Sequence, residues 1–262
     1  MEFTMTLPAL PISNTGIEVS RLGLGTVKWG RNQQVKYPAF ELPDDSTLHA
    51  LLDIAESAGL NLLDTAPAYG IAEERLGKIL AERQPSSFVV MTKTGEEFIN
   101  GMSCYDFSVQ HTESSVIRSL RRLRSEALDL VMVHCSANDL DVLDQTPVLE
   151  TLQKLRDKGH IRAIGVSTMT VEGGLLAVEV SDAVMVPFSL GYQAHLPVIE
   201  KAYRLGKAVF IKRALYSGPA QDSQVPLREM LAPVLQTPGV TSVIAGTINP
   251  LHLKENIEAL LA

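Results

Sequence analysis

The sequence LNLLDTAPAYG, residues 60–70, joins a short apolar run to a carboxylate and then to a tyrosine. Its first half has the continuous apolarity of a strand buried on both faces, which is typical of parallel sheets. Asp64 stands where the apolar run stops, and Tyr69 follows it in a turn-like segment. A buried strand that ends on a charged residue indicates a site at the carboxyl end of a sheet.

Seven other short apolar runs recur along the chain, at residues 21–26, 88–93, 128–134, 161–167, 182–188, 208–212 and 241–246. Amphipathic stretches with helical spacing separate them, such as residues 72–83, 113–129 and 146–160. Another such stretch, at residues 45–61, has an N-cap candidate at Asp45 or Ser46 and a stop at Gly59. Eight strand–helix repeats in 262 residues predict an α/β fold, a (β/α)8 TIM barrel that forms one domain over residues 1–262.

A doubly wound sheet is the alternative to the barrel, and it normally carries a G-x-G-x-x-G turn after its first strand. The matching segment here, GLGTVKWG at residues 23–30, lacks the third glycine and is not followed by a clear helical pattern. The leading residues 7–23 hold a turn at Asn14-Thr15-Gly16 between two extended runs. They predict an N-terminal β-hairpin that closes the bottom of the barrel.

Composition limits the partners and the compartment. The net charge of −7 disfavours nucleic acid or an anionic membrane as a partner. Two cysteines, Cys104 and Cys135, make no disulfide framework, and the N-terminal residues show no signal-peptide pattern. No apolar run approaches membrane-spanning length. We therefore expect a cytoplasmic protein, a monomer or small homo-oligomer, that acts on small molecules.

Charged and polar residues end several predicted strands. Asp64, Lys93, His134 and Ser167 each stand at such an end, so a barrel would gather them at one mouth with Tyr69 above them. A lysine cation beside a phenol lowers the tyrosine pKa from its ordinary value of about 10. Such a tyrosine can give a proton to a carbonyl oxygen, or take one in reverse. The pattern predicts no metal ligands, so redox chemistry would need a bound cofactor.

Several motifs, taken in order, resemble the aldo-keto reductase family over nearly the whole chain. They are DTAPAYG with EERLGKIL at residues 64–80, LVMVH at 130–134, GHIRAIGVS at 159–167 and GVTSVIAGTINPLHLKEN at 239–256. The resemblance implies that Tyr69 is the proton donor, that Lys93 and Asp64 lower its pKa, and that His134 orients the carbonyl. It also implies that NADPH supplies a hydride to the carbonyl carbon of an aldehyde or ketone.

The same resemblance implies a cofactor site built from strand ends, their loops and the last helix. Its residues are Gly25, Thr26, Asp64, Ser167, Thr168, Met185, Lys212, Arg213, Leu215, Ser217, Gly218, Gly246, Thr247, His252, Glu255 and Asn256. The family usually has Asn and Gln where this chain has Thr168 and Met185, and an aromatic residue where it has Lys212. Gly246 and His252 stand where Lys and Arg commonly hold the 2′-phosphate. The expectation is therefore NADP(H), with NAD(H) possible.

The substrate pocket is expected around Trp29, Tyr69 and His134, between the loops at residues 27–45 and 94–110. No long tail follows the last helix in this sequence, which predicts an open pocket for small or polar carbonyls.

Two other functions stay open. One is an aldolase or lyase that forms a Schiff base on Lys93. The other is a nicotinamide-binding regulatory barrel with little turnover. This alternative stays open because Thr168, Met185 and Lys212 differ from the family's usual nicotinamide contacts.

Overall fold

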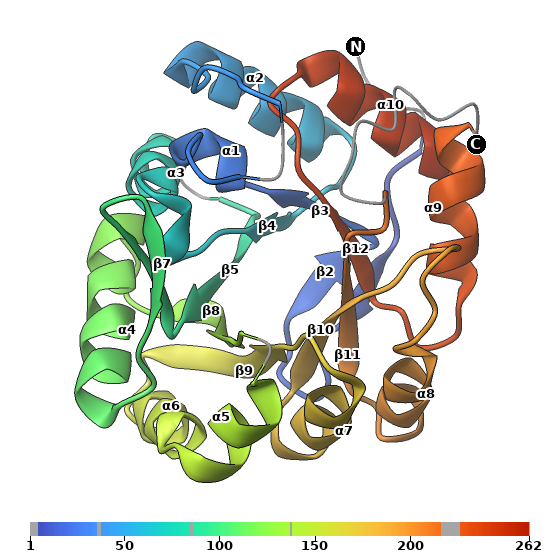
Figure 1. Ribbon diagram of the computed structural model, residues 1–262. Helices are drawn as coiled ribbons and strands as arrows, with labels where there is room; N and C mark the ends of the chain where they lie inside the picture. The colour runs from blue at the N-terminus through green and yellow to red at the C-terminus, as the bar shows by residue number, and fades with distance from the viewer. Residues whose placement is uncertain (1–4, 36–37, 84–85, 137, 216–225, 262) are drawn as a thin grey trace.

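The computed structural model describes residues 5–35, 38–83, 86–136, 138–215 and 226–261. Among these residues, parallel strands close into a barrel in the order β10-β11-β12-β3-β4-β5-β8-β9, which confirms the predicted fold (Figure 1). Each strand begins and ends within one residue of its predicted run. The strands are β3 (Leu22–Gly25), β4 (Leu62–Asp64), β5 (Val89–Thr94), β8 (Leu128–His134), β9 (Ile161–Ser167), β10 (Ala183–Pro187), β11 (Ala208–Lys212) and β12 (Ser242–Ala245).

Helices surround the barrel and bury their apolar faces against its strands (Figure 1). The longer ones are α2 (Asp45–Ser57), α3 (Ala72–Ala81), α4 (Val109–Leu123), α6 (Val148–Asp157), α7 (Val171–Val180), α8 (Leu196–Arg204), α9 (Leu227–Gln236) and α10 (Pro250–Leu261). Shorter pieces, α1 (Val27–Gly30), the 3-10 turn η1 (Pro67–Tyr69) and α5 (Asp139–Gln145), lie in connections that follow strands. Within the described ranges, no helix is long and apolar enough to cross a membrane.

The start of α2 differs from the sequence expectation by one residue. The Asp44 side chain, rather than Asp45 or Ser46, caps the helix by accepting a hydrogen bond from the Thr47 backbone N–H at 2.7 Å. Asp45 is left free to bridge Arg75 and Lys78 on α3, each at 2.8 Å. The far end agrees with the prediction, because α2 ends at Ser57 just before Gly59.

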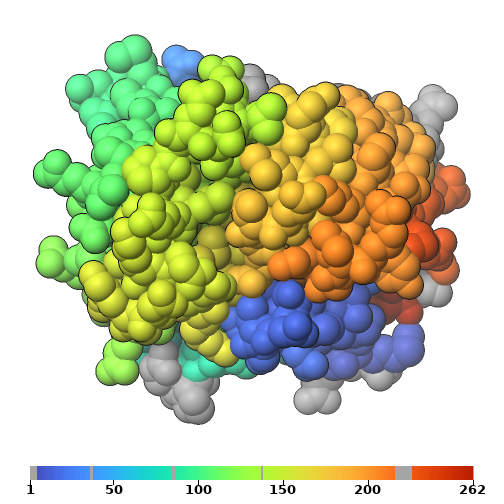
Figure 2. Space-filling view, turned by 90° about the horizontal axis from the view of Figure 1, so that it is seen from below, coloured from blue at the N-terminus to red at the C-terminus, as the bar shows by residue number. Residues whose placement is uncertain are grey.

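A hairpin of β1 (Ala9–Pro11) and β2 (Glu18–Ser20) closes one end of the barrel, as predicted. Its buried side chains Ile12, Ile17 and Val19 join the cluster that fills the barrel interior, which includes Met91 and Phe210. These side chains exclude water from the N-terminal ends of the strands. In Figure 2 the N-terminal segment, in blue, lies at the surface against the orange residues around α8.

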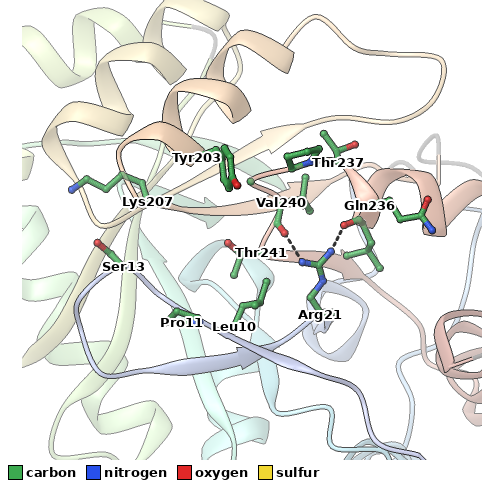
Figure 3. A pocket seen from close by; sticks show the side chains of 14 residues that line it. Leu10, Pro11, Ser13, Arg21, Tyr203, Lys207, Gln236, Thr237, Val240 and Thr241 are labelled. Atoms are coloured by element: carbon green, nitrogen blue, oxygen red, sulfur yellow. Dashed lines mark hydrogen bonds between the residues drawn. The ribbon is translucent and has the colours of Figure 1, made fainter.

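A cavity of about 530 Å³ lies beside this hairpin (Figure 3). Arg21 crosses it and donates hydrogen bonds to the carbonyl oxygens of Leu235 and Val240. Lys207 and Thr241 also line it. Because Arg21, Lys207 and Thr241 each precede a barrel strand, the cavity lies on the N-terminal side, opposite the strand ends that carry the candidate site.

A second hairpin follows β5, where the sequence analysis expected an irregular loop. Its strands are β6 (Glu96–Ile99) and β7 (Met102–Tyr105), and we call residues 96–105 the mouth hairpin. Asn100 and Gly101 form its two-residue turn with φ of 51° and 81°. Positive φ at both central residues defines the type I′ turn that suits antiparallel strands. The Asn-Gly pair was therefore the sequence signal for this hairpin.

Candidate active site

The strand register brings the predicted catalytic residues to one end of the barrel, here called the mouth. Asp64 pairs with Gly25 of β3, and His134 pairs with Ser167 of β9. Lys93 lies on β5, which runs between β4 and β8. Parallel strands share one direction, so their carboxyl ends collect these side chains without any further loop.

Asp64 and Lys93 form a buried ion pair at the mouth. Their residues are 5% and 1% exposed, and Lys93 Nζ bonds to Asp64 Oδ1. The same ammonium donates to the Thr65 carbonyl oxygen at 2.8 Å. Two charges removed from water in this way are tolerated because they compensate each other. Asp64 and the Thr65 carbonyl therefore hold the Lys93 ammonium in one place beneath the mouth.

Tyr69 stands directly beside this cation. The turn η1 begins at Pro67, whose fixed φ suits the first helical position, and the Tyr69 N–H bonds to the Ala66 carbonyl at 3.0 Å. Lys93 Nζ lies 4.6 Å from the centroid of the Tyr69 ring. The His134 ring meets the same tyrosine edge-on, with centroids 6.3 Å apart. The structure thus brings together all four side chains that the sequence analysis proposed as catalytic.

Gly70 sets the turn that holds Tyr69. Its φ is 64° and its ψ is −121°, a backbone conformation that residues other than glycine rarely adopt. A Cβ at this position would lie 2.2 Å from the Gly30 carbonyl oxygen, because α1 crosses the turn at that point. Gly70 therefore permits both the backbone conformation and the close contact with α1.

We expect Gly70→Ala to lower the free energy of unfolding by about 3 kcal/mol, since strain and the clash with Gly30 add. Displacement of Tyr69 should also reduce turnover, by about tenfold or more. Urea denaturation and steady-state rates measure the two effects. Gly159→Ala is the control, because Gly159 has a φ of 82° but open space around its Cβ. Equal losses of stability in the two variants would contradict a special role for the contact with α1.

His134 has a partner that the sequence analysis did not propose. Its Nδ1 atom lies 2.8 Å from Oε2 of Glu96, the first residue of the mouth hairpin. Burial lowers the pKa of His134, Glu96 opposes that effect, and the positive charges of Lys93 and Lys212 add to it. A carboxylate directly after a strand was visible in the sequence, but only the hairpin turns it back toward β8.

Lys212 ends β11 and reaches across the mouth. Its Nζ atom donates to the Ser167 hydroxyl at 2.9 Å. Burial first, and then the positive charges of Arg213 and Lys93, lower the pKa of Lys212 to about 7. A lysine with this pKa changes its charge near neutrality, unlike an ordinary surface lysine. Ser167 and Lys212, proposed separately as cofactor contacts, therefore form one donor pair.

The other proposed cofactor contacts near the strand ends are mostly buried. Thr26 donates through its hydroxyl to the Asp64 carbonyl at 3.0 Å, beside Gly25. The Thr168 N–H bonds to the Met185 carbonyl at 3.0 Å, and the Met185 side chain packs inside the barrel. Arg213 is exposed, Leu215 is partly buried against the core, and Ser217 and Gly218 lie outside the described residues.

The last group lies at β12 and α10. Gly246 is exposed directly after β12, and the Thr247 hydroxyl accepts a hydrogen bond from the Asn249 N–H at 3.0 Å, just before α10 begins. On α10, His252 is half-buried, Glu255 is exposed and Asn256 is 6% exposed. Because β12 pairs with β3, this group lies next to Gly25 and Thr26 rather than in a separate region.

Trp29 does not lie on an open pocket wall, where the sequence analysis placed it. It is fully buried in α1 as part of the hydrophobic core. Its carbonyl oxygen accepts a hydrogen bond from Arg75 of α3 at 2.8 Å. The partly exposed side chains at the mouth are instead those of Tyr69 and His134. Among the described residues, no group of His, Cys, Asp and Glu could hold a metal ion.

Comparison with known proteins identifies the family of this chain. The model of the aldo/keto reductase family matches residues 21–185. The aldo-keto reductase YhdN of Bacillus subtilis is 36% identical over 164 residues, and L-galactose dehydrogenase of Arabidopsis thaliana is 34% identical over 167 residues. Each match covers 62% of this chain and 47% or 48% of the relative, so it spans about half the length of those proteins.

A solved structure from Pseudomonas aeruginosa, assigned to the aldo-keto reductases, matches with a TM-score of 0.89 and 45% identity. That match covers 98% of this chain and 96% of the other. The chain therefore belongs to the aldo/keto reductase family, as the motifs around Asp64, His134 and Ser167 led us to expect.

Proposed function

We propose that this protein is an NADP(H)-dependent oxidoreductase that reduces an aldehyde or ketone to an alcohol, or catalyses the reverse. The observation that carries the proposal is the Tyr69 phenol at the mouth, between the buried Lys93 cation and the His134 ring. A phenol in that position is suited to exchange a proton with a carbonyl or alcohol oxygen.

The proposed mechanism assigns one task to each residue. Tyr69 gives its hydroxyl proton to the carbonyl oxygen as the carbon is reduced. Lys93 stabilises the resulting phenolate through its charge, and Asp64 keeps that ammonium paired and in place. His134 contacts the same substrate oxygen and orients it toward Tyr69. The nicotinamide cofactor, when bound, supplies the hydride.

The residues at the mouth fit a nicotinamide nucleotide. The Thr168 hydroxyl oxygen is buried and has no hydrogen-bond partner among the described residues, as expected of a group that meets a polar ligand. Ser167 and Lys212 add donors beside it. The N-terminus of the long helix α10 suits a phosphate, and His252 of its first turn would supplement it. This set favours NADP(H) while leaving NAD(H) as a second cofactor.

The structure gives less support to a Schiff base on Lys93. That ammonium is 1% exposed and bonded to both Asp64 and the Thr65 carbonyl, whereas a nucleophilic lysine needs an available lone pair. A regulatory barrel with little turnover differs from the reductase in activity rather than in geometry.

We further propose that residues 1–262 act as one domain on small-molecule carbonyls in the cytoplasm, where free Cys104 and Cys135 would stay reduced.

Fluorescence titration with NADPH and with NADH tests the proposal, followed by addition of 4-nitrobenzaldehyde and measurement of cofactor oxidation. We expect tighter binding of NADPH, aldehyde-dependent turnover, and in His252→Ala a loss of NADPH affinity with NADH affinity unchanged. His160→Ala, a change just before β9 and far from α10 in sequence, is the control. Binding without turnover would favour the regulatory barrel, and binding of neither nucleotide would refute the nicotinamide function.

A further inference from the structure

The mouth hairpin presents one polar face toward the catalytic candidates. Its register places Glu96 opposite Tyr105 and Phe98 opposite Ser103, so these four side chains share a face. The Glu96 carboxylate lies at His134 Nδ1, and the Arg31 guanidinium stacks 3.5 Å above the Phe98 ring. The opposite face is separate, because Glu97 pairs with Arg118 and His111 of α4.

The Glu96 carboxylate is held in its charged form. Burial alone would raise its pKa, but hydrogen bonding and charge from His134, with help from Ser103 and Arg31, outweigh burial and hold the pKa at about 2. An ionised carboxylate only accepts hydrogen bonds. The 2.8 Å contact between Glu96 Oε2 and His134 Nδ1 is an ionic contact outside regular hydrogen-bond geometry, since Nδ1 has no hydrogen-bond partner among the described residues. A bare nitrogen lone pair at this distance would face the anion, so the charge of Glu96 favours the ring proton on Nδ1.

We propose that Glu96 is a positioning residue that fixes His134 with its proton on Nδ1 and leaves the Nε2 lone pair for the reacting oxygen. This inference rests on the proposed oxidoreductase function, because it assigns His134 to the substrate oxygen. Carboxylate–imidazole contacts select one tautomer and raise the basicity of the second ring nitrogen. Glu96 would thus act on the reaction through His134 without touching the substrate.

The two directions of the reaction then use His134 differently. A neutral ring of this tautomer accepts a hydrogen bond from an alcohol, which helps oxidation. It can donate to a carbonyl oxygen only after Nε2 also gains a proton, so reduction should become faster as the pH falls through the His134 pKa. The charged and titratable groups that face this ring are Glu96, Lys93, Lys212 and Tyr69.

The first test measures His134 itself. ¹⁵N–¹H spectra of the histidine side chains are recorded against pH, and the His134 signals are identified by their absence in His134→Gln. We expect a neutral ring protonated on Nδ1 in the unmutated protein. In Glu96→Gln, whose amide can either donate or accept, both tautomers should be present and the pKa should fall by about one unit. Glu97→Gln, the neighbouring residue on the other face, should change neither.

The second test measures both directions of turnover in the same variants. With a pKa lower by about one unit, the doubly protonated ring is about tenfold scarcer above that pKa. Glu96→Gln should therefore lower kcat for aldehyde reduction about tenfold at pH 7, with KM little changed. Tyr105→Phe removes one hydrogen-bond donor from Glu96 and keeps the carboxylate charge. It should therefore raise the pKa of His134 slightly and shift the pH profile by less, in the opposite direction.

Two results would overturn the inference. One is a neutral His134 protonated on Nε2 in the unmutated protein, and the other is an unchanged His134 titration in Glu96→Gln. Because the spectra do not depend on turnover, they remain decisive even if no carbonyl is reduced. A protein that shows the Nδ1 tautomer and binds no nicotinamide would refute the proposed function while preserving the Glu96–His134 pairing.

Discussion

Tyr69→Phe is expected to reduce turnover by at least about 10²-fold, the usual scale for loss of a general acid. The substitution removes one oxygen atom and keeps the ring that packs beside Lys93 and His134. Cofactor affinity should stay near that of the unmutated protein, since Tyr69 is not among the proposed cofactor contacts and all of these except Asp64 lie on or after other strands. Measurements of kcat with an activated aldehyde, and of Kd by fluorescence, separate the two properties.

Tyr203→Phe provides the matched control for this experiment. Tyr203 is 63% exposed on α8, at the cavity on the opposite side of the barrel, so loss of its hydroxyl should leave turnover unchanged. Parallel losses of turnover and cofactor affinity in Tyr69→Phe would show a structural role. Undiminished turnover would refute the assignment of Tyr69 as the proton donor.

The barrel could be predicted from the sequence because each of its features is local. Buried parallel strands are continuously apolar, so each run shows its own limits, and the alternation with helices specifies the closed topology. The gathering of Asp64, Lys93 and His134 follows from the same logic, because strand ends meet wherever parallel strands do. The resemblance to the family then gave these positions chemical roles that the topology alone does not supply.

The partner of His134 could not be found in that way. Glu96 reaches the imidazole only because a type I′ turn at Asn100-Gly101 folds residues 96–105 back over the mouth. The Asn-Gly pair predicts a hairpin, but nothing in the sequence gives the direction in which its polar face points. The burial of Trp29 could not be predicted either. An aromatic residue in a loop after β3 was expected to be accessible from the pocket. The short helix α1 instead buries it against the core.

Removal of one partner from the Asp64–Lys93 pair should have the largest effect on stability. Lys93→Met leaves a carboxylate that is 5% exposed without its cation, and it removes the donor to the Thr65 carbonyl. An unpaired buried charge of this kind typically costs about 3–5 kcal/mol of unfolding free energy. Turnover should also fall by about 10²-fold or more, because no charge remains to stabilise the phenolate of Tyr69.

The double variant Asp64→Asn/Lys93→Met separates these two consequences. It removes both charges at once, so most of the lost stability should return, with a coupling energy of about 2 kcal/mol or more between the two sites. Turnover should stay as low as in Lys93→Met, since the proposed mechanism requires the cation and not a well-packed pair. Urea denaturation of the four proteins gives the coupling, and steady-state assays give the rates. Recovery of turnover together with stability would mean that Lys93 serves the fold alone, and that Tyr69 exchanges its proton without a neighbouring charge.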